Sequence, residues 1–377
     1  MKYCKKCVMP DTRPGLNIGK DGLCDACRHY EKRKDIDWDK RQRMLRDLAD
    51  NYRRHDGNYD CIIAASAGKD SYFQTHVFKE QLDMNPLLVM VNNYSWTETG
   101  LQNWNNLLEE FGVDAIQFSQ SPRTCKIMFS KGLEKSIPTW YFDRAIYTFP
   151  LLIAARLKIP LIVYGENVNY EYGGLQENET SSARQQMNNS VANKQPVYEW
   201  LDENISKECF ASHRPPDKSE LQTISPIYLS YYFPWSGYKN MMFARTRGFK
   251  TLDDTGEWKR EGFIEQYDQI DTVGYLIHPW FKFAKFGHYR TTDIGSSWIR
   301  EGRITREEVV EKVIDNDWKI DQKMLDDFLG YINCSRKEFW DIVEKYINRK
   351  ILEKREFNWR LKKNVEKALI SGGKVVD

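Results

Sequence analysis

The central part of the chain, from Asp60 onward, alternates short apolar runs with longer amphipathic stretches. The apolar runs resemble buried strands in length and composition, at residues 61–65, 86–93, 114–119 and 160–165. The segments between and after them have helical periodicity, over about residues 71–84, 98–111, 122–135 and 143–157. This alternation predicts an α/β fold with a doubly wound parallel sheet. Ligands bind such sheets at the carboxyl ends of the strands, so we expect the chemistry after the first and fourth strands.

The pattern changes on either side of this sheet domain, which we assign to residues 59–215. Residues 1–35 are rich in turn formers and cysteine, and residues 36–58 contain an amphipathic linking helix. Residues 216–377 are aromatic-rich and end in charged helices over about 305–370. The polar stretch 173–196 lacks apolar periodicity; we expect a loop beside the ligand site, and a disordered insertion is the alternative.

Composition and charge narrow the class of protein. Over 377 residues, 41% hydrophobic and 14% aromatic positions indicate a folded globular protein. No apolar run approaches the roughly 18 residues that cross a bilayer, and the amino terminus lacks a secretory pattern, so we expect a soluble cytoplasmic protein without membrane contact. Basic residues exceed acidic ones by only 56 to 54, which makes nucleic acid an unlikely partner without excluding a local basic patch.

The first strand ends in the sequence SAGKDS, which leads directly into a helix. In that context successive backbone N–H groups and the positive end of the helix dipole point toward one place, which suits an anion. Gly68 permits close backbone approach, Lys69 adds a cation, and Ser66 and Ser71 supply hydroxyl groups. The motif therefore predicts a phosphate-binding loop, with an ordinary strand-to-helix turn as the alternative.

This loop does not follow the Walker-A pattern of nucleotide-binding proteins. Ile63 stands where that pattern has its first glycine, and Lys69 is followed by Asp70 rather than by Ser or Thr. A second sequence, SGGK at residues 371–374, follows no buried strand and lacks the aspartate. Only the loop after the first strand is therefore a candidate.

Four of the eight cysteines lie within the first 27 residues, as Cys4 with Cys7 and Cys24 with Cys27. Each Cys-x-x-Cys pair forms a tight turn that brings two thiolates to one metal ion, and two pairs complete a tetrahedron. We expect a closed structural zinc site in a zinc ribbon. An iron–sulfur cluster or redox-active thiols are the alternatives.

The loop resembles the S-G-G-x-D-S signature of the PP-loop ATP pyrophosphatases and departs from it only at Ala67. The resemblance implies a sheet domain of the adenine nucleotide α-hydrolase-like type, in which a substrate oxygen attacks the α-phosphate of ATP. Carried over by position, the ATP-binding residues are Ser66, Ala67, Gly68, Lys69, Asp70, Ser71, Asn92 and Gly165. Asp70 would bind the Mg²⁺ that neutralises the leaving pyrophosphate, and Lys69, Asp70 and Glu166 are the expected catalytic residues.

Ala67 stands where the signature has glycine. If this position requires a left-handed backbone, alanine costs about 1–2 kcal/mol. If its Cβ atom projects toward the phosphates, ATP affinity falls. We expect a working loop.

Two further segments carry candidate residues. In YGENVNYEYGG, which follows the fourth strand, Glu166 and Asn167 are candidates to bind Mg²⁺ or substrate, or else merely to cap local backbone. The aromatic block over residues 266–313 offers polar groups that could meet an anionic sugar nucleotide, with rings to stack on sugar or base. Its candidates are His278, Lys285, Arg290, Asp293, Arg300 and Arg303. A helical region whose charges are solvated or paired is the alternative.

Nearly the whole chain resembles the N-acetyl sugar amidotransferases, PP-loop enzymes of bacterial surface-polysaccharide and lipopolysaccharide O-antigen biosynthesis. The resemblance rests on the cysteine pairs, SAGKDSY, GENVNYEYGG and KFGHYRTTDIGSSWIREGRITREE. It implies ATP-dependent conversion of the acetamido group of a nucleotide-activated N-acetyl sugar to an acetamidino group. It also implies an ammonia-supplying partner similar to glutaminase and cyclase subunits, since no cysteine has the setting of a glutaminase nucleophile.

Two other functions remain alternatives. A PP-loop tRNA thiolase also joins such a loop to zinc-binding cysteines, but it requires reactive cysteines near the loop and a basic RNA-binding face. The chain would be a non-catalytic nucleotide-binding subunit if Ala67 had abolished catalysis by the loop. Pyrophosphate release with sugar substrate and ammonium would exclude that subunit.

Overall fold

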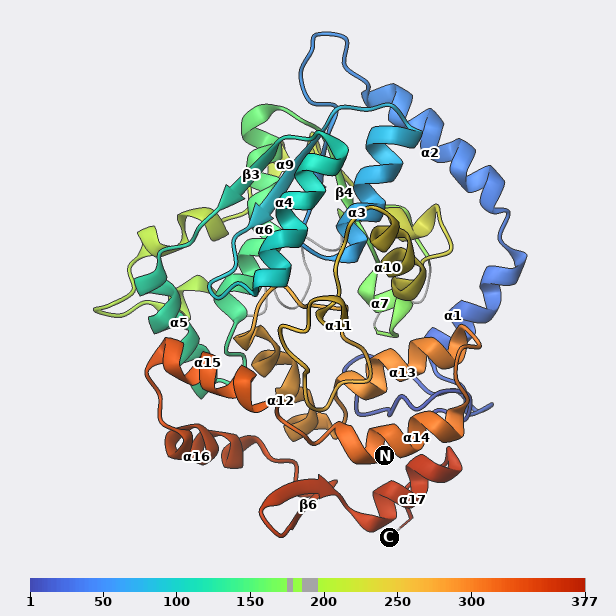
Figure 1. The fold of residues 1–377 in the computed structure, drawn as a ribbon, viewed down its shortest axis with the longest axis vertical. Helices are drawn as coiled ribbons and strands as arrows, with labels where there is room; N and C mark the ends of the chain where they lie inside the picture. The colour runs from blue at the N-terminus through green and yellow to red at the C-terminus, as the bar shows by residue number, and fades with distance from the viewer. Residues whose placement is uncertain (175–178, 185–195, 377) are drawn as a thin grey trace.

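The structure, a computed structural model, describes residues 1–174, 179–184 and 196–376. Its centre is a five-stranded parallel sheet in the order β3-β2-β1-β4-β5 (Figure 1). The strands are β1 Cys61–Ala64, β2 Pro86–Val91, β3 Ala115–Phe118, β4 Leu161–Tyr164 and β5 Ser225–Tyr228. The predicted doubly wound α/β class and the four predicted strands are confirmed. The strand order reverses between β1 and β4, and this switch point is where ligands bind such sheets.

The two faces of the sheet pack against different helices. Ile63 of β1 belongs to the same buried cluster as Trp104 of α4 (Glu98–Phe111), whereas the adjacent Ile62 packs with Leu151 and Ala154 of α6 (Trp140–Leu157). Neighbouring strand residues point to opposite faces, so a continuous apolar run is needed to bury both. The remaining helices of this part are α3 Lys69–His76, which continues as a π-helical turn over Val77–Gln81, α5 Pro122–Glu134, α7 Val168–Glu171 and α9 Lys218–Gln222.

The cysteine-containing unit packs against the carboxy-terminal helices. It runs into α1 (Asp25–Lys32), and α2 (Trp38–Tyr52) then leads to β1 (Figure 1). Helix α2 lies within residues 36–58, where the sequence predicts the linking helix. The Tyr3 N–H donates to the carbonyl of Gly373 at 2.9 Å, and Arg306 Nε donates to the carbonyl of Cys7 at 3.2 Å. The two ends of the described chain therefore lie side by side, and the small unit is anchored far along the sequence.

The carboxy-terminal region is mainly helical, as expected, but a β-hairpin interrupts the predicted helices. Its strands are β6 Leu352–Arg355 and β7 Asn358–Leu361, and Glu356 in the turn has φ = +55°. The predicted charged helices over about residues 305–370 lie on both sides of this hairpin, which forms because Leu352 and Leu361 are buried opposite each other at strand spacing. The helices are α10 Gly237–Thr246, α11 Leu252–Thr255, α12 Ile277–Phe286, α13 Arg290–Arg300, α14 Arg306–Asn316, α15 Gln322–Ile332, α16 Arg336–Tyr346 and α17 Lys363–Ser371.

The polar stretch predicted as a loop is described only in part, because residues 175–178 and 185–195 lie outside the described residues. Within it, the N–H of Ala183 donates to the carbonyl of Pro226 at 2.8 Å, and the N–H of Tyr228 donates to the carbonyl of Ser181 at 2.9 Å. Residues 181–183 thus run along the outer edge of β5. Among the described helices, none has the length and hydrophobicity that a membrane crossing requires.

Candidate active site

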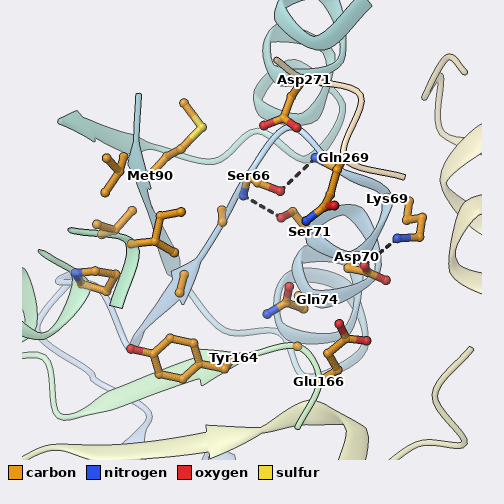
Figure 2. Close-up of a pocket in the computed structure, with 18 of the residues that line it drawn as sticks. Ser66, Lys69, Asp70, Ser71, Gln74, Met90, Tyr164, Glu166, Gln269 and Asp271 are labelled. Atoms are coloured by element: carbon orange, nitrogen blue, oxygen red, sulfur yellow. Dashed lines mark hydrogen bonds and ion pairs between the residues drawn. The ribbon is translucent and has the colours of Figure 1, made fainter. Parts of the chain in front are cut away.

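The SAGKDS loop connects the end of β1 to the start of α3 and folds around two serine hydroxyls (Figure 2). The N–H of Ser66 donates to Oγ of Ser71 at 2.9 Å, and the N–H of Gly68 donates to Oγ of Ser66 at 3.1 Å. Gly68 lines the cavity in front of the loop, and a Cβ atom built there would meet only Ser66 Oγ, at 3.1 Å. The missing side chain at Gly68 therefore keeps the backbone open to an incoming group.

Ala67 fits this loop without strain. Its φ is not positive, and its side chain is fully buried in the core cluster beneath the loop. It does not line the cavity, so its Cβ atom neither requires a left-handed backbone nor intrudes on a phosphate. Both reasons for doubting the loop are removed.

Lys69 is held between two carboxylates. Its Nζ atom lies 2.9 Å from Asp70 Oδ2 and 2.6 Å from Asp268 Oδ1, and Asp268 also pairs with Arg290. Burial alone would lower the pKa of Lys69, but Asp268 and Asp70 raise it well above its usual value. Asn240 donates to the other oxygen of Asp70 at 2.7 Å. The loop lysine is thus a fixed, charged ammonium group.

Glu166 follows β4 and faces the same place (Figure 2). Trp235 Nε1 donates to its Oε2 at 3.1 Å. Burial, and then repulsion from Asp70, raises the pKa of Glu166 to about 8. The side-chain amide of Gln74 has one end 3.0 Å from the Gly165 nitrogen and the other 3.3 Å from the Asp70 carbonyl oxygen, so with its oxygen turned toward Gly165 it joins the segment after β4 to α3. The structure thus brings together the two segments that the sequence selected.

A cavity of about 310 Å³ opens in front of the loop. One wall is apolar and comes from β2 and α6, with Met90, Val89, Phe142, Ile146 and Pro150. Another part of the lining comes from the segment before α12, where Asp271 Oδ2 accepts from Asn93 at 2.7 Å. Gln269 there has φ = +50°, and its buried Oε1 has no partner within the described part of the chain. A phosphate cradle at one end and an apolar wall at the other suit a nucleotide.

Four acidic side chains line the cavity in front of the loop. Asp70, Glu166, Asp268 and Asp271 all line the cavity, and burial raises the pKa of Asp271. These carboxylates would repel a polyphosphate unless a divalent cation lay between them. Within the described residues they do not converge on one point as the four cysteines do. A Mg²⁺ ion would therefore take one or two of them and complete its shell with phosphate oxygens and water.

Several predicted residues lie outside this cavity. The amide of Asn92 is occupied by Ser119 Oγ at 2.9 Å and Trp96 Nε1 at 2.7 Å, and the cavity is lined by Asn93 instead. The side chain of Asn167 is buried and accepts from the N–H of Tyr170 at 3.4 Å, capping α7.

The other substrate candidates are divided. Arg290 reaches the site through Asp268, whereas His278 lies 2.9 Å from Asp143 and Lys285 donates to the Ser136 carbonyl at 3.1 Å. Asp293 pairs with Arg13 at 3.1 Å and with Lys282, and Arg300 donates to the carbonyl of Glu171 at 3.3 Å. Of these five side chains, only that of Arg290 is linked to the loop among the contacts of the described residues, because it pairs with Asp268, which pairs with Lys69.

Sequence reasoning missed Asp268, Asp271, Gln269 and Trp235. The stretch QYDQIDT at residues 266–272 was visible as polar groups among aromatics. Asp268 follows Lys69 by 199 residues in the sequence. No local pattern shows which carboxylate of this stretch faces the loop.

The four predicted zinc ligands converge. All four sulfur atoms lie within 4.8 Å of one another and are buried; Sγ of Cys4 is 3.8 Å from that of Cys27, and Sγ of Cys7 is 3.6 Å from that of Cys24. A tetrahedral Zn²⁺ ion with Zn–S bonds of about 2.3 Å places its sulfurs about 3.8 Å apart. The geometry fits a closed structural zinc site.

Comparison with known proteins identifies the carboxy-terminal segment. Residues 261–366 match the family described as LPS biosynthesis protein WbpG-like, C-terminal domain. This segment is similar to that domain over 106 of the 377 residues of the chain. The expected relation to surface-polysaccharide biosynthesis is thereby confirmed, and the matched residues include Asp268, Asp271 and Arg290.

A second similarity is to an archaeal protein. The chain is 30% identical over 114 residues to the uncharacterized protein MJ1599 of Methanocaldococcus jannaschii. The similarity covers 30% of this chain and 41% of that protein, so the chain spans less than half the length of this relative.

Proposed function

We propose that the chain is an ATP-dependent amidotransferase of surface-polysaccharide biosynthesis. It would convert the acetamido group of a nucleotide-activated N-acetyl sugar to an acetamidino group, forming AMP and pyrophosphate. The observation that carries the proposal is the loop over residues 66–71, with Lys69 fixed between Asp70 and Asp268 in front of a nucleotide-sized cavity. The WbpG-like domain supplies the polysaccharide context.

The chemistry explains why ATP is needed. An amide oxygen is a poor leaving group, so ammonia does not displace it directly. In the first step this oxygen forms a bond to the α-phosphorus while the bond to pyrophosphate breaks. Lys69 and the positive end of the α3 dipole stabilise the charge on the departing pyrophosphate. Bound Mg²⁺, held by Asp70 and Glu166, would neutralise part of the same charge.

The second step replaces the activated oxygen. The nitrogen lone pair of ammonia forms the C–N bond, the C–O bond breaks, and AMP leaves with the electron pair. The proton lost by nitrogen goes to the departing phosphate. We propose that a separate glutaminase-type subunit supplies the ammonia and that the reaction takes place in the cytoplasm.

The alternatives are less well supported. Cys61 is fully buried in β1, and burial raises its pKa, so the cysteine nearest the loop is a poor persulfide carrier for a thiolase. Ala67 gives no reason to expect a non-catalytic subunit, because its side chain lies in the core.

Substitutions in the loop test the proposal. Lys69→Ala and Asp70→Ala are each expected to abolish AMP formation while the far-ultraviolet circular dichroism spectrum stays unchanged. Lys337→Ala is a matched control, because that lysine is 85% exposed and pairs only with Asp341 among the described contacts. Turnover retained in either loop variant would show that the site is misassigned.

A further inference from the structure

Gln269 has an unusual backbone conformation for a residue with a side chain. Its φ is +50°, in the left-handed region that residues other than glycine rarely adopt. It lines the nucleotide cavity, and Figure 2 shows its side chain extending from the segment before α12 toward the loop. Strained residues of this kind persist only where their surroundings fix them, and they gather at ligand sites. The position therefore calls for a functional explanation.

The residues on both sides of Gln269 are fixed. The carboxylate of Asp268 pairs with the loop lysine at 2.6 Å, and the carbonyl of Asp268 accepts from Arg260 Nη1 at 2.9 Å. The carbonyl of Ile270 accepts from Thr97 Oγ1 at 2.5 Å. Because these contacts hold the chain before and after it, Gln269 keeps its left-handed conformation and its side chain stays in the cavity lining.

The carboxamide of Gln269 has no hydrogen-bond partner among the contacts of the described residues. Its Oε1 atom is buried and unpartnered, whereas the carboxylates beside it are engaged, Asp268 by the loop lysine and Asp271 by Asn93 at 2.7 Å. A half-turn of the carboxamide exchanges its oxygen and nitrogen, so either can face the cavity. A polar group left without a partner in a binding cavity suits a ligand that completes its hydrogen bonds.

The place of Gln269 identifies the ligand group that it would meet. Asp268, its neighbour in the chain, pairs with Lys69, so Gln269 lies at the end of the cavity where the phosphates would bind. In the proposed reaction the acetamido group of the sugar must reach the α-phosphate there. That group has a carbonyl oxygen, which is used in the attack, and one N–H group, which is left to donate to Gln269 Oε1.

We propose that Gln269 binds the N–H of the sugar's acetamido group, and that it thereby selects N-acetyl sugars and orients them for the first step. This inference rests on the proposed function, since it names the residue that recognises the substrate of that reaction. The nucleotide itself is left to the loop and the apolar wall.

The same hydrogen bond assists the first step. When the carbonyl oxygen bonds to the α-phosphorus, the nitrogen lone pair moves into the C–N bond, and pyrophosphate leaves with the electron pair of the broken P–O bond. The nitrogen keeps its proton and gains positive charge, so its hydrogen bond to Gln269 strengthens as the transition state forms. A neutral carboxamide does this without repelling the phosphates, as a further carboxylate would.

Two substitutions separate recognition from backbone strain. Gln269→Leu removes the carboxamide and keeps the strain, whereas Gln269→Gly removes both, because glycine adopts a positive φ freely. Sugar-dependent exchange of labelled pyrophosphate into ATP, with a panel of nucleotide-activated N-acetyl sugars, reports the first step alone. In both variants of the full chain, kcat/KM for the nucleotide sugar should fall about tenfold or more, while the KM for ATP stays within about twofold of the parent. Gln102→Leu, at an exposed glutamine of α4, is the matched control and should change neither.

An ester analogue tests which atom is recognised. A nucleotide sugar with an O-acetyl group in place of the N-acetyl group keeps the carbonyl and lacks the N–H. In calorimetric titrations the parent should bind the N-acetyl form at least about tenfold more tightly than the O-acetyl form. In Gln269→Gly the two affinities should agree within about twofold.

The outcomes distinguish a failure of this assignment from a failure of the proposed function. Parent-like exchange in Gln269→Gly would overturn the assignment, because the residue would then act only through its backbone. A preference for the N-acetyl form that persists in Gln269→Gly would overturn it as well, and so would a rise in the KM for ATP alone. Absence of exchange in the parent protein with every sugar of the panel would overturn the proposed function itself, and this assignment with it.

Discussion

Replacing Ala67 by glycine restores the loop signature, and we expect it to cost stability without improving ATP binding. The methyl group of Ala67 is fully buried, so its loss removes about 0.8 kcal/mol of apolar burial. The added backbone freedom of the unfolded chain costs a further 0.4–1 kcal/mol or so. Together the free energy of unfolding should fall by about 1–2 kcal/mol.

The adjacent Gly68→Ala provides the reciprocal control. Gly68 has φ = −87°, which alanine adopts without strain, and its Cβ atom would project into the nucleotide cavity beside Ser66. This variant should keep its stability and bind ATP at least about tenfold more weakly, a loss of about 1.4 kcal/mol. Urea denaturation measures the stabilities, and calorimetric titration with ATP and Mg²⁺ measures the affinities.

The outcome of this pair distinguishes two readings of the loop. A large gain in ATP affinity in Ala67→Gly would refute the reasoning, because it would mean that the alanine obstructs the phosphates. Unchanged ATP affinity in Gly68→Ala would also refute the reasoning, because the open backbone at Gly68 would then not be the phosphate site.

Three further predictions concern the zinc site and the buried charges. Cys24→Ser should lose its zinc, and one zinc per chain by metal analysis of that variant would disprove the ribbon. Asp268→Ala should lower the free energy of unfolding by about 3 kcal/mol, because it removes the carboxylate shared by the buried Lys69 and the half-buried Arg290. A loss under about 1 kcal/mol in urea denaturation would contradict this. Burial lowers the pKa of His213 to about 3. Below about pH 6.5 the unfolded chain binds a proton on His213 and the folded chain does not, so the free energy of unfolding should fall by about 1.4 kcal/mol per pH unit from 6.5 toward 3. His213→Gln should weaken that dependence. An unchanged slope of the unfolding free energy between pH 6.5 and 4 in this variant would contradict the prediction.

The sequence predicts the parts of this molecule whose physical cause is local. Strands β1, β2 and β4 are continuous apolar runs because both faces of the sheet are buried there, and that pattern is visible without tertiary information. Strand β3 lies at the edge of the sheet and exposes Gln117, so its expected burial is wrong. The SAGKDS loop and the two cysteine pairs are equally local, because a few adjacent residues position the groups that bind phosphate or metal.

What the sequence did not predict depends on long-range packing. Strand β5, Ser225–Tyr228, is as short as β1, but Ser225 and Pro226 interrupt its apolar pattern, and it pairs with the edge of β4. Asp268 and Asp271 are two acidic residues among 54, and only the fold brings them to the loop. The choice of Asn92 rather than Asn93 is a difference of one residue at a strand end, where the direction of a side chain is hardest to foresee.

The central claim is tested most directly by the reaction itself. The full-length protein is incubated with ATP, Mg²⁺, ammonium and a panel of nucleotide-activated N-acetyl sugars, with transfer RNA as a separate arm. Our account predicts that one sugar elicits AMP and pyrophosphate in equal amounts, and that its mass falls by the difference between an oxygen atom and an NH group. Pyrophosphate release that depends on transfer RNA, or ATP binding without turnover on any sugar of the panel, would contradict it.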